Sequence, residues 1–242
     1  MKSDLNGRVA LITGAGSGVG RATSRALSAA GATTLLTGRT PEPLAETARM
    51  IEAAGSHAFA IPADITAESS VRDLVSTATS TIGKPIDILI AAAGVGLYGP
   101  VADYILADWH TTLNTNLTGV FLLSRDVLPG MIAAGGGAII AVGSGASKQG
   151  YANLAAYAAS KFGLLGFMQS LAAEVGQHGI KVSTILPGSV ATTFAGKTLA
   201  DVDAGRAAGK SYLEPDDVAE GILYLLRQPD RAWTQEMNLW PR

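Results

Sequence analysis

Short apolar runs alternate with longer segments of helical period along the whole chain. The runs are rich in Val, Ile and Leu and predict buried strands, while the segments between them repeat apolar residues every three or four positions and predict helices. We expect strands at residues 8–13, 33–37, 57–62, 86–92, 138–142, 181–186 and 237–239. We expect helices at residues 19–30, 43–54, 68–82, 108–128, 153–175 and 216–226.

Alternation of strands and helices predicts a parallel sheet of about seven strands with right-handed crossovers, covered by helices on both faces. The sequence therefore predicts a doubly wound α/β fold, and its 242 residues suit a single domain over 1–242. Such sheets bind ligands beyond the carboxyl ends of their strands. The segment 192–210 interrupts the alternation, because it is rich in Ala, Gly and Thr without a strong apolar stripe. We expect residues 192–213 to be a substrate lid, with an ordinary surface excursion as the alternative.

Composition narrows the function. Hydrophobic residues make up 48% of the chain and charged residues 16%, which suits a large core and excludes intrinsic disorder. Eighteen Lys and Arg against 20 Asp and Glu leave a net charge of −2 without a basic stripe, so nucleic acid is not an expected partner. There is no cysteine, and the three histidines are far apart, so we expect neither thiolate chemistry nor a metal site.

Targeting signals are not apparent in the sequence. The N-terminus is polar, unlike a signal peptide. The longest uncharged apolar stretch, residues 88–102, is interrupted by Gly and Pro and falls short of the roughly 20 residues of a membrane span. We therefore expect a soluble, cytoplasmic protein with no membrane partner.

A glycine-rich turn directly follows the first predicted strand. It reads Thr-Gly-Ala-Gly-Ser-Gly-Val-Gly over residues 13–20 and opens an alanine-rich helix. A phosphate needs backbone N–H donors at a helix N-terminus and a close approach of the main chain, which side chains would block. This placement predicts a Rossmann-type dinucleotide site, whereas a turn that only needs positive φ is the alternative. The residues that we expect to bind the cofactor here are Gly14, Ser17, Gly18, Val19 and Gly20.

The end of the second predicted strand favours NADP(H). An NAD site usually carries Asp or Glu there to hold the ribose 2′-hydroxyl. Here the chain reads Leu-Thr-Gly-Arg-Thr over residues 36–40, and Arg39 has the forked donors that pair with a 2′-phosphate. NAD(H) remains the alternative, with Arg39 solvated or stacked on adenine.

The predicted helix at 153–175 carries Tyr157 and Lys161, whose spacing of four places both on one face. A fixed cation beside a phenol lowers the phenol's pKa, so Tyr157 suits a general acid or base. Ser144 follows the strand at 138–142 and precedes Tyr157 by 13 residues, where its hydroxyl can bond a carbonyl oxygen as charge develops. Ser147 is the competing hydroxyl.

These motifs, with glycines in the order G-x-x-x-G-x-G, resemble the short-chain dehydrogenase/reductase family over nearly the whole chain. The resemblance implies that Asn116, with Asn114 as the competing position, relays a proton through water towards Lys161, which also holds the nicotinamide ribose. This chain departs from the family pattern at Ala91 and Ala92, where the family has two asparagines. The remaining cofactor-binding residues that it implies are Asp64, Ile65, Ala93, Gly94, Tyr157, Lys161, Pro187, Gly188, Val190 and Thr192. For Asp64, helix capping is the alternative.

The resemblance implies hydride transfer between C4 of nicotinamide and a carbonyl carbon. We therefore expect an NADP(H)-dependent carbonyl reductase that interconverts a ketone or aldehyde and an alcohol. A non-catalytic dinucleotide-binding regulatory or scaffolding protein is the alternative, and an epimerase-like or dehydratase variant is another. The loops expected to line the pocket favour a small to medium, mostly apolar substrate, although Lys148 would suit an acidic one. They contribute Val95, Leu97, Tyr98, Lys148, Gln149, Tyr151, Leu154 and Phe194.

The predicted helix at 153–175 is apolar almost all round, unlike a helix buried on one side only. Burial against a second copy explains this pattern, and the family commonly forms dimers and tetramers through this helix. We therefore expect a homo-oligomer. The C-terminus lacks the Gly-Gly ending that is frequent in the family.

Overall fold

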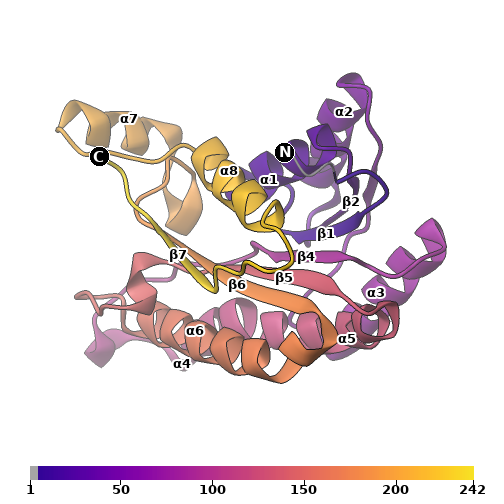
Figure 1. The fold of residues 1–242 in the computed structure, drawn as a ribbon. Coiled ribbons are helices and arrows are strands. Elements are labelled where there is room, and N and C mark those ends of the chain that lie inside the picture. Colours follow the sequence, from indigo (N-terminus) through magenta and orange to yellow (C-terminus); the bar gives the residue numbers. More distant parts are fainter. Residues whose placement is uncertain (1–4) are drawn as a thin grey trace.

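A parallel sheet lies at the centre of the molecule (Figure 1). The computed structural model describes residues 5–242, and in these the sheet has seven strands in the order β3-β2-β1-β4-β5-β6-β7. The order reverses between β1 and β4, which is where doubly wound sheets bind ligands. The predicted doubly wound fold is thus confirmed. The strands are β1 Val9–Thr13, β2 Thr33–Thr37, β3 Ala58–Ala60, β4 Ile88–Ala91, β5 Gly137–Val142, β6 Ile180–Pro187 and β7 Glu236–Leu239.

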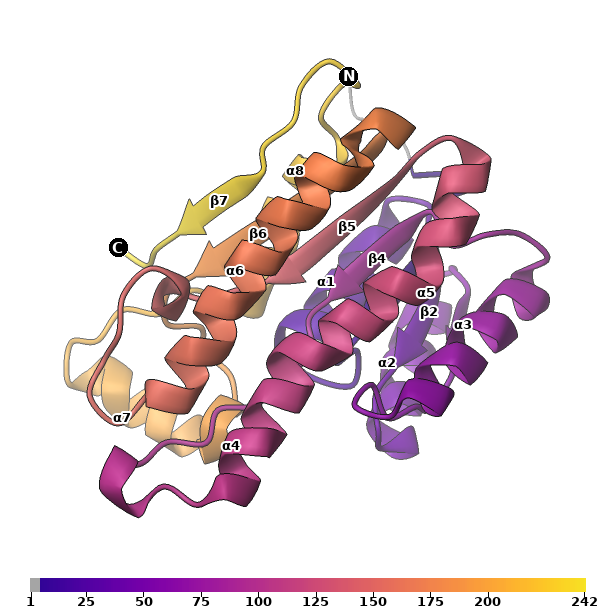
Figure 2. The same cartoon turned by 90° about the horizontal axis from the view of Figure 1, so that it is seen from below.

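Helices cover both faces of the sheet, as predicted (Figures 1 and 2). One face carries α1 (Gly18–Ala29), α2 (Pro41–Ala53) and α8 (Pro215–Leu226). The other carries α3 (Glu68–Ile82), α5 (Gly119–Ala134) and α6 (Ala155–Val175). Successive strand residues point to opposite faces, so one strand serves two cores. Leu11 belongs to the core under α3, α5 and α6, and its neighbour Ile12 belongs to the other core.

The helix expected at 108–128 differs most from its prediction. It begins as α4 (Leu106–Leu113), passes through a π-helical turn, η2 (Asn114–Thr118), and continues as α5 to Ala134. Pro129 lies inside α5 rather than ending it, and Gly135 ends the helix in the left-handed conformation with φ 71°. The other helices that were predicted begin and end within two residues of their expected bounds.

The continuous helical stretch Leu106–Ala134 is 29 residues long and apolar enough to cross a membrane by length and composition alone. Its place in the fold accounts for this apolarity. Val120, Leu123, Val127 and Met131 all belong to the core between the helices and the sheet. Figure 2 shows this stretch running across the sheet between α3 and α6.

The segment 192–213 leaves the sheet after β6 and contains a 3-10 turn, η5 (Phe194–Gly196), and a helix, α7 (Leu199–Ala207). Two backbone hydrogen bonds close its base, from Ala191 N to Leu213 O (2.8 Å) and from Leu213 N to Ser189 O (2.8 Å). Thr198 and Asp201 cap α7 reciprocally, which the sequence analysis did not predict. The segment therefore leaves and rejoins the fold at one point, beyond the carboxyl end of β6 (Figure 1).

Candidate active site

Three glycines of the turn after β1 are required for different reasons. Gly14 has φ 66°, and a Cβ there would lie 2.9 Å from the Cα of Ala93. A Cβ on Gly20 would lie 2.2 Å from the carbonyl oxygen of Gly14, whereas Gly18 has φ 47° and faces Thr192. Positive φ thus explains Gly18, close backbone approach explains Gly20, and both apply to Gly14.

The start of α1 suits an anionic group. In the described part of the chain, the N-cap residue Ser17 makes no side-chain hydrogen bond to the first turn of α1. The backbone N–H groups of that turn therefore stay available to bind an anion. Thr192 lies beside the turn, because a Cβ on Gly18 would come within 3.2 Å of its Cγ2. The glycine turn, the end of β4 and the segment after β6 thus form one cradle, which fits the pyrophosphate of a dinucleotide.

Thr13 secures the segment after β4, a role that the sequence analysis missed. Its Oγ1 accepts hydrogen bonds from the backbone N–H groups of Ala92 (3.1 Å) and Ala93 (3.0 Å). In this chain, a hydroxyl from the neighbouring strand thus holds the backbone where the family carries asparagines. The position of Thr13 at the end of β1, next to β4, is the feature of the sequence that could have indicated this role.

Arg21 was also missed. Its guanidinium donates to the carbonyl oxygen of Gly16 (2.6 Å), to Glu46 (2.7 Å) and to Thr47 Oγ1 (3.1 Å). Thr47 in turn donates to the carbonyl oxygen of Ala15 (3.0 Å). Two carbonyls of the glycine turn are therefore bonded to side chains, and the turn is fastened to α2.

Tyr157 and Ser144 meet at the carboxyl end of β5. The Ser144 hydroxyl is close enough to that of Tyr157 to influence its pKa, and the Tyr157 side chain is almost fully buried. Burial raises the pKa of Tyr157, the Ser144 hydroxyl lowers it, and the neighbouring Tyr98 raises it further. Burial has the largest effect, so the pKa of Tyr157 is above its ordinary value. The spacing of Tyr157 and Lys161 predicts a lowered pKa, because the sequence reveals the nearby cation but not the depth of burial.

Lys161 lies one helical turn beyond Tyr157, as the spacing predicts. Its Nζ is 5.7 Å from the centroid of the Tyr157 ring and donates to the carbonyl oxygen of Val142 (2.8 Å). Burial lowers the pKa of Lys161 to about 8. The ammonium is therefore costly to bury and ready to lose its proton slightly above neutral pH.

Two serines compete for the place beside Tyr157, and the structure separates them. Ser144 Oγ accepts from Ala146 N (3.2 Å) and reaches Tyr157. Ser147 is 1% exposed, and its hydroxyl accepts instead from the backbone N–H of Ser144 (3.3 Å). Ser144 therefore faces the phenol, while Ser147 holds the loop behind it.

Asn116 is fully buried in the π-helical turn, whereas Asn114 is exposed. Its Oδ1 accepts from Val95 N (2.8 Å), and its Nδ2 donates to Val95 O (2.9 Å) and Ser160 Oγ (3.0 Å). Ser160 in turn donates to the carbonyl oxygen of Tyr157 (2.7 Å). Asn116 thus joins the loop after β4 to the helix that carries Tyr157, which is the local reason for an asparagine inside this helix.

Aromatic rings surround Tyr157. The Tyr98 ring packs edge-on at 5.7 Å between centroids, and the Phe194 ring lies tilted at 5.9 Å. Gly96 lets both approach, because a Cβ there would lie 2.7 Å from Phe194 and 2.8 Å from the Tyr98 hydroxyl oxygen. Tyr98 and Phe194, both expected in the pocket, therefore line an apolar surface around the phenol.

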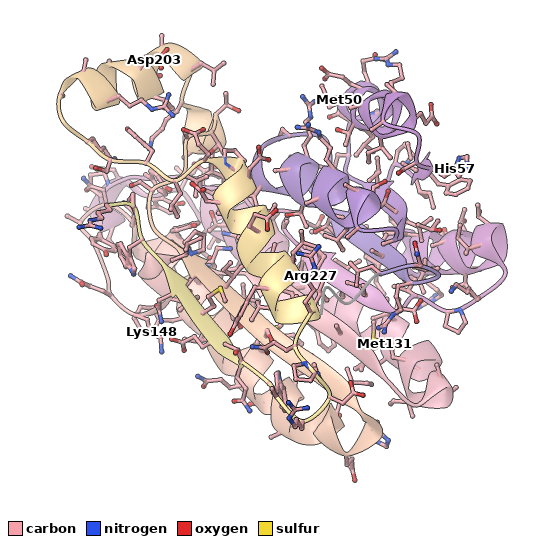
Figure 3. The ribbon with its side chains drawn as sticks, turned by 45° about the horizontal axis from the view of Figure 1, so that its top comes forward. Met50, His57, Met131, Lys148, Asp203 and Arg227 are labelled. Carbon is pink, nitrogen blue, oxygen red and sulfur yellow. The ribbon has the colours of Figure 1, made fainter. Side chains whose placement is uncertain are left out.

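Lys148 is directed elsewhere. Its ammonium pairs with Glu236 at 2.7 Å, and Figure 3 shows Lys148 beside β7. Because this charge is already paired, it does not provide the free cation that an acidic substrate would need. Of the other residues expected in the pocket, Gln149 and Tyr151 are exposed, and Leu154 packs on Tyr157.

The remaining cofactor candidates follow the carboxyl ends of the strands. Arg39 is exposed after β2, and its charge contributes to the lowered pKa of Asp64 after β3. The largest cause of that lowering is the backbone hydrogen bond from Thr66, so Asp64 closes a local turn. Ile65 packs on Gly119, where a Cβ would lie 3.0 Å from its side chain.

The remaining predicted residues at this edge of the sheet follow β4 and β6. A Cβ on Gly94 would lie 3.3 Å from Asn116 Oδ1 and 3.9 Å from Lys161 Nζ, so Gly94 borders the catalytic candidates. Pro187 ends β6, and Gly188 follows it and donates to Leu239 O (2.8 Å). Val190 bridges to Leu213 at the base of the segment 192–213. All predicted site residues therefore lie along the edge where parallel strands end.

This geometry defines an NAD(P)-dependent oxidoreductase with a doubly wound sheet. A model of the short chain dehydrogenase family matches residues 8–203, and the chain belongs to that family. It is 32% identical to an uncharacterised oxidoreductase from Staphylococcus haemolyticus, with 99% of each chain covered. It is 35% identical to a glycine betaine reductase from Emericella nidulans, but spans only 19% of that protein's length. A metagenomic short-chain oxidoreductase, solved in complex with NADP, shares its fold with a TM-score of 0.86, 35% identity and 99% coverage of both chains.

Proposed function

We propose that this protein is an NADP(H)-dependent carbonyl reductase that interconverts a small to medium, mostly apolar ketone or aldehyde and the alcohol. The observation that carries the proposal is the buried side chain of Tyr157, which lies beside Ser144 and is bordered by the rings of Tyr98 and Phe194. The bound cofactor supplies the hydride at C4 of its nicotinamide. The protein supplies the proton and the environment in which it moves.

Each catalytic candidate has a separate task in this proposal. Tyr157 is protonated at neutral pH, since the pKa of a tyrosine lies well above 7 and burial raises it further, so it suits donation of a proton to the substrate oxygen. The Ser144 hydroxyl bonds the same oxygen as negative charge develops. The Lys161 ammonium stabilises the phenolate that remains, and Asn116 positions α6 through Ser160. A proton donor held protonated favours reduction over oxidation at neutral pH.

A lid and a location complete the proposal. Phe194, at the start of the segment 192–213, touches the Tyr157 ring, so movement of this segment would open and close access to the phenol. The two ends of the segment are bonded side by side at Ala191 and Leu213, so the part between them can move without separating strands of the sheet. We propose that residues 192–213 are the substrate lid and that the enzyme works dissolved in the cytoplasm.

The purified protein is expected to oxidise NADPH when given a small neutral ketone, with kcat/KM at least about tenfold higher than for NADH. Arg39→Ala is expected to remove this preference, because a bond to a charged group contributes about 1.5–3 kcal/mol, which is tenfold or more. Cofactor absorbance measures both rates. Arg49→Ala, at an exposed arginine of α2 that pairs with Glu42, is the matched control.

Two results would contradict this assignment. Faster turnover with NADH by the unaltered protein would refute Arg39 as a phosphate ligand. Conversion of a substrate without net change in NADPH would favour the epimerase-like or dehydratase alternative.

We also propose that the exposed side of α6 packs against a second copy of the chain. Its exposed side carries Ala159, Phe162 and Gly166, and the exposed Phe121 of α5 lies next to Phe167. Small and aromatic residues on neighbouring helices suit close packing of a dimer, from which a tetramer can be built. Light scattering is expected to give the mass of two or four chains, and Phe162→Asp to give one. Tyr224→Asp, on α8 across the sheet, is the control, and a monomeric native protein would contradict the proposal.

A further inference from the structure

The indole of Trp240 lies against two glycines of the site. A Cβ on Gly145 would be 2.8 Å from Trp240 Cη2, and a Cβ on Gly188 would be 2.9 Å from Trp240 Cε3. The ring therefore packs directly on the backbone of two segments that are far apart in sequence. Trp240 follows β7 and is held there by the bond from Gly188 N to Leu239 O (2.8 Å).

One of these segments carries the serine of the site. Gly145 directly follows Ser144 and opens the 3-10 turn η3 (Gly145–Ser147). We call residues 144–148 the serine loop. Inside the loop, Ser144 and Ser147 exchange hydrogen bonds between side chain and backbone, which fixes the local shape of the turn. These bonds do not fix where the turn lies relative to Tyr157, so that placement requires contacts from outside the loop.

The C-terminal strand supplies contacts at both ends of the serine loop. Trp240 packs on Gly145 at its beginning, and Glu236 pairs with Lys148 at its end (2.7 Å). Glu236 begins β7, whereas Trp240 follows the strand's last residue. The loop is thus braced along the length of one strand, by an ion pair at one end and by a packed ring at the other.

We propose that Trp240 is a positioning residue that holds the Ser144 hydroxyl against Tyr157. A flat, rigid ring on a glycine fixes the distance of that backbone from β7, and a small side chain such as alanine leaves that space unfilled. Removal of the ring leaves a gap under Gly145 into which the loop can shift. This inference rests on the proposed function, because Ser144 and Tyr157 are its catalytic pair.

The first test measures turnover. Trp240→Ala is expected to lower kcat about 10- to 100-fold, the loss expected from a misplaced group. The Kd for NADPH should stay within about twofold of the native value, and Trp240→Phe should keep most of the activity.

The pH profile gives a second readout. In alcohol oxidation, the rise of kcat with pH is expected to move to higher pH in Trp240→Ala, because Tyr157 loses the interaction with Ser144 that lowers its pKa. In a Ser144→Ala background, Trp240→Ala is expected to have little further effect. Tyr224→Ala is the control, since Tyr224 and Trp240 are both 57% exposed.

A second test does not depend on turnover. Hydrogen–deuterium exchange of residues 143–150 is expected to rise in Trp240→Ala, while exchange of β1 and α1 stays unchanged. Full additivity of Trp240→Ala with Ser144→Ala would overturn the proposal, as would weakened NADPH binding with unchanged kcat, which would assign the ring to Gly188 instead. Unchanged exchange in the serine loop would overturn it too. If exchange rises but the native protein reduces no ketone, the brace stands and the proposed function fails.

Discussion

Tyr157→Phe is expected to lower kcat for carbonyl reduction by about 10³-fold, within the range of general acid catalysis, with Kd for NADPH within about threefold. Phenylalanine keeps the ring between Tyr98 and Phe194 and removes only the hydroxyl that Ser144 contacts. The loss should therefore fall on the chemical step and not on cofactor binding. Steady-state turnover and a fluorescence titration with NADPH measure the two quantities separately.

Tyr98→Phe provides the matched control. It removes a second phenol whose ring is 5.7 Å from that of Tyr157, and we expect less than a tenfold loss of kcat. If Tyr157→Phe kept a tenth or more of the native kcat, the proton donor would have to be another group. If Tyr98→Phe had the larger effect, that group would be Tyr98.

Lys161→Met is expected to lower kcat by about 10²-fold or more, through loss of an electrostatic contact to the phenolate, while it stabilises the fold. Lys161 is 4% exposed, and burial lowers its pKa from 10.5 to about 8. Below pH 8 the ammonium is charged in both the folded and the unfolded state, so the folded protein bears the full cost of its burial. Methionine removes that cost. We therefore expect the Tm at neutral pH to rise by about 2–5 °C.

The pH dependence follows from the same shift. Between pH 8 and 10.5 the unfolded state binds more protons at this lysine than the folded state, so the free energy of unfolding of the native protein rises with pH. The advantage of Lys161→Met should therefore shrink across this window. Thermal melts followed by circular dichroism measure it, with Lys197→Met, at an exposed lysine of the segment 192–213, as the control. If the Tm advantage of Lys161→Met stayed constant or grew with pH, the burial of the ammonium would not be the cause of the stabilisation.

Most of the fold could be predicted from local sequence patterns. Apolar runs and helical periodicity are properties of one element at a time, so strands such as β1 and helices such as α3 were predicted to within a residue or two. Elements whose limits depend on neighbours were predicted less well. Within residues 5–242, strand β3 pairs only with β2 and is shorter than expected. Helix α5 continues through Pro129 as part of a long packed helix.

The same division holds within the site. The sequence by itself determined the glycine turn and the pair Tyr157 and Lys161, because a turn between adjacent elements and a spacing of four on a helix are local geometry. Only the tertiary structure decided between Ser144 and Ser147, set the pKa of Tyr157 above its ordinary value and paired Lys148 with Glu236. It alone placed Thr13 under Ala93 and Trp240 against Gly145. These outcomes depend on which strands lie side by side and on how deeply each group is buried, and both are set by contacts between residues distant in sequence.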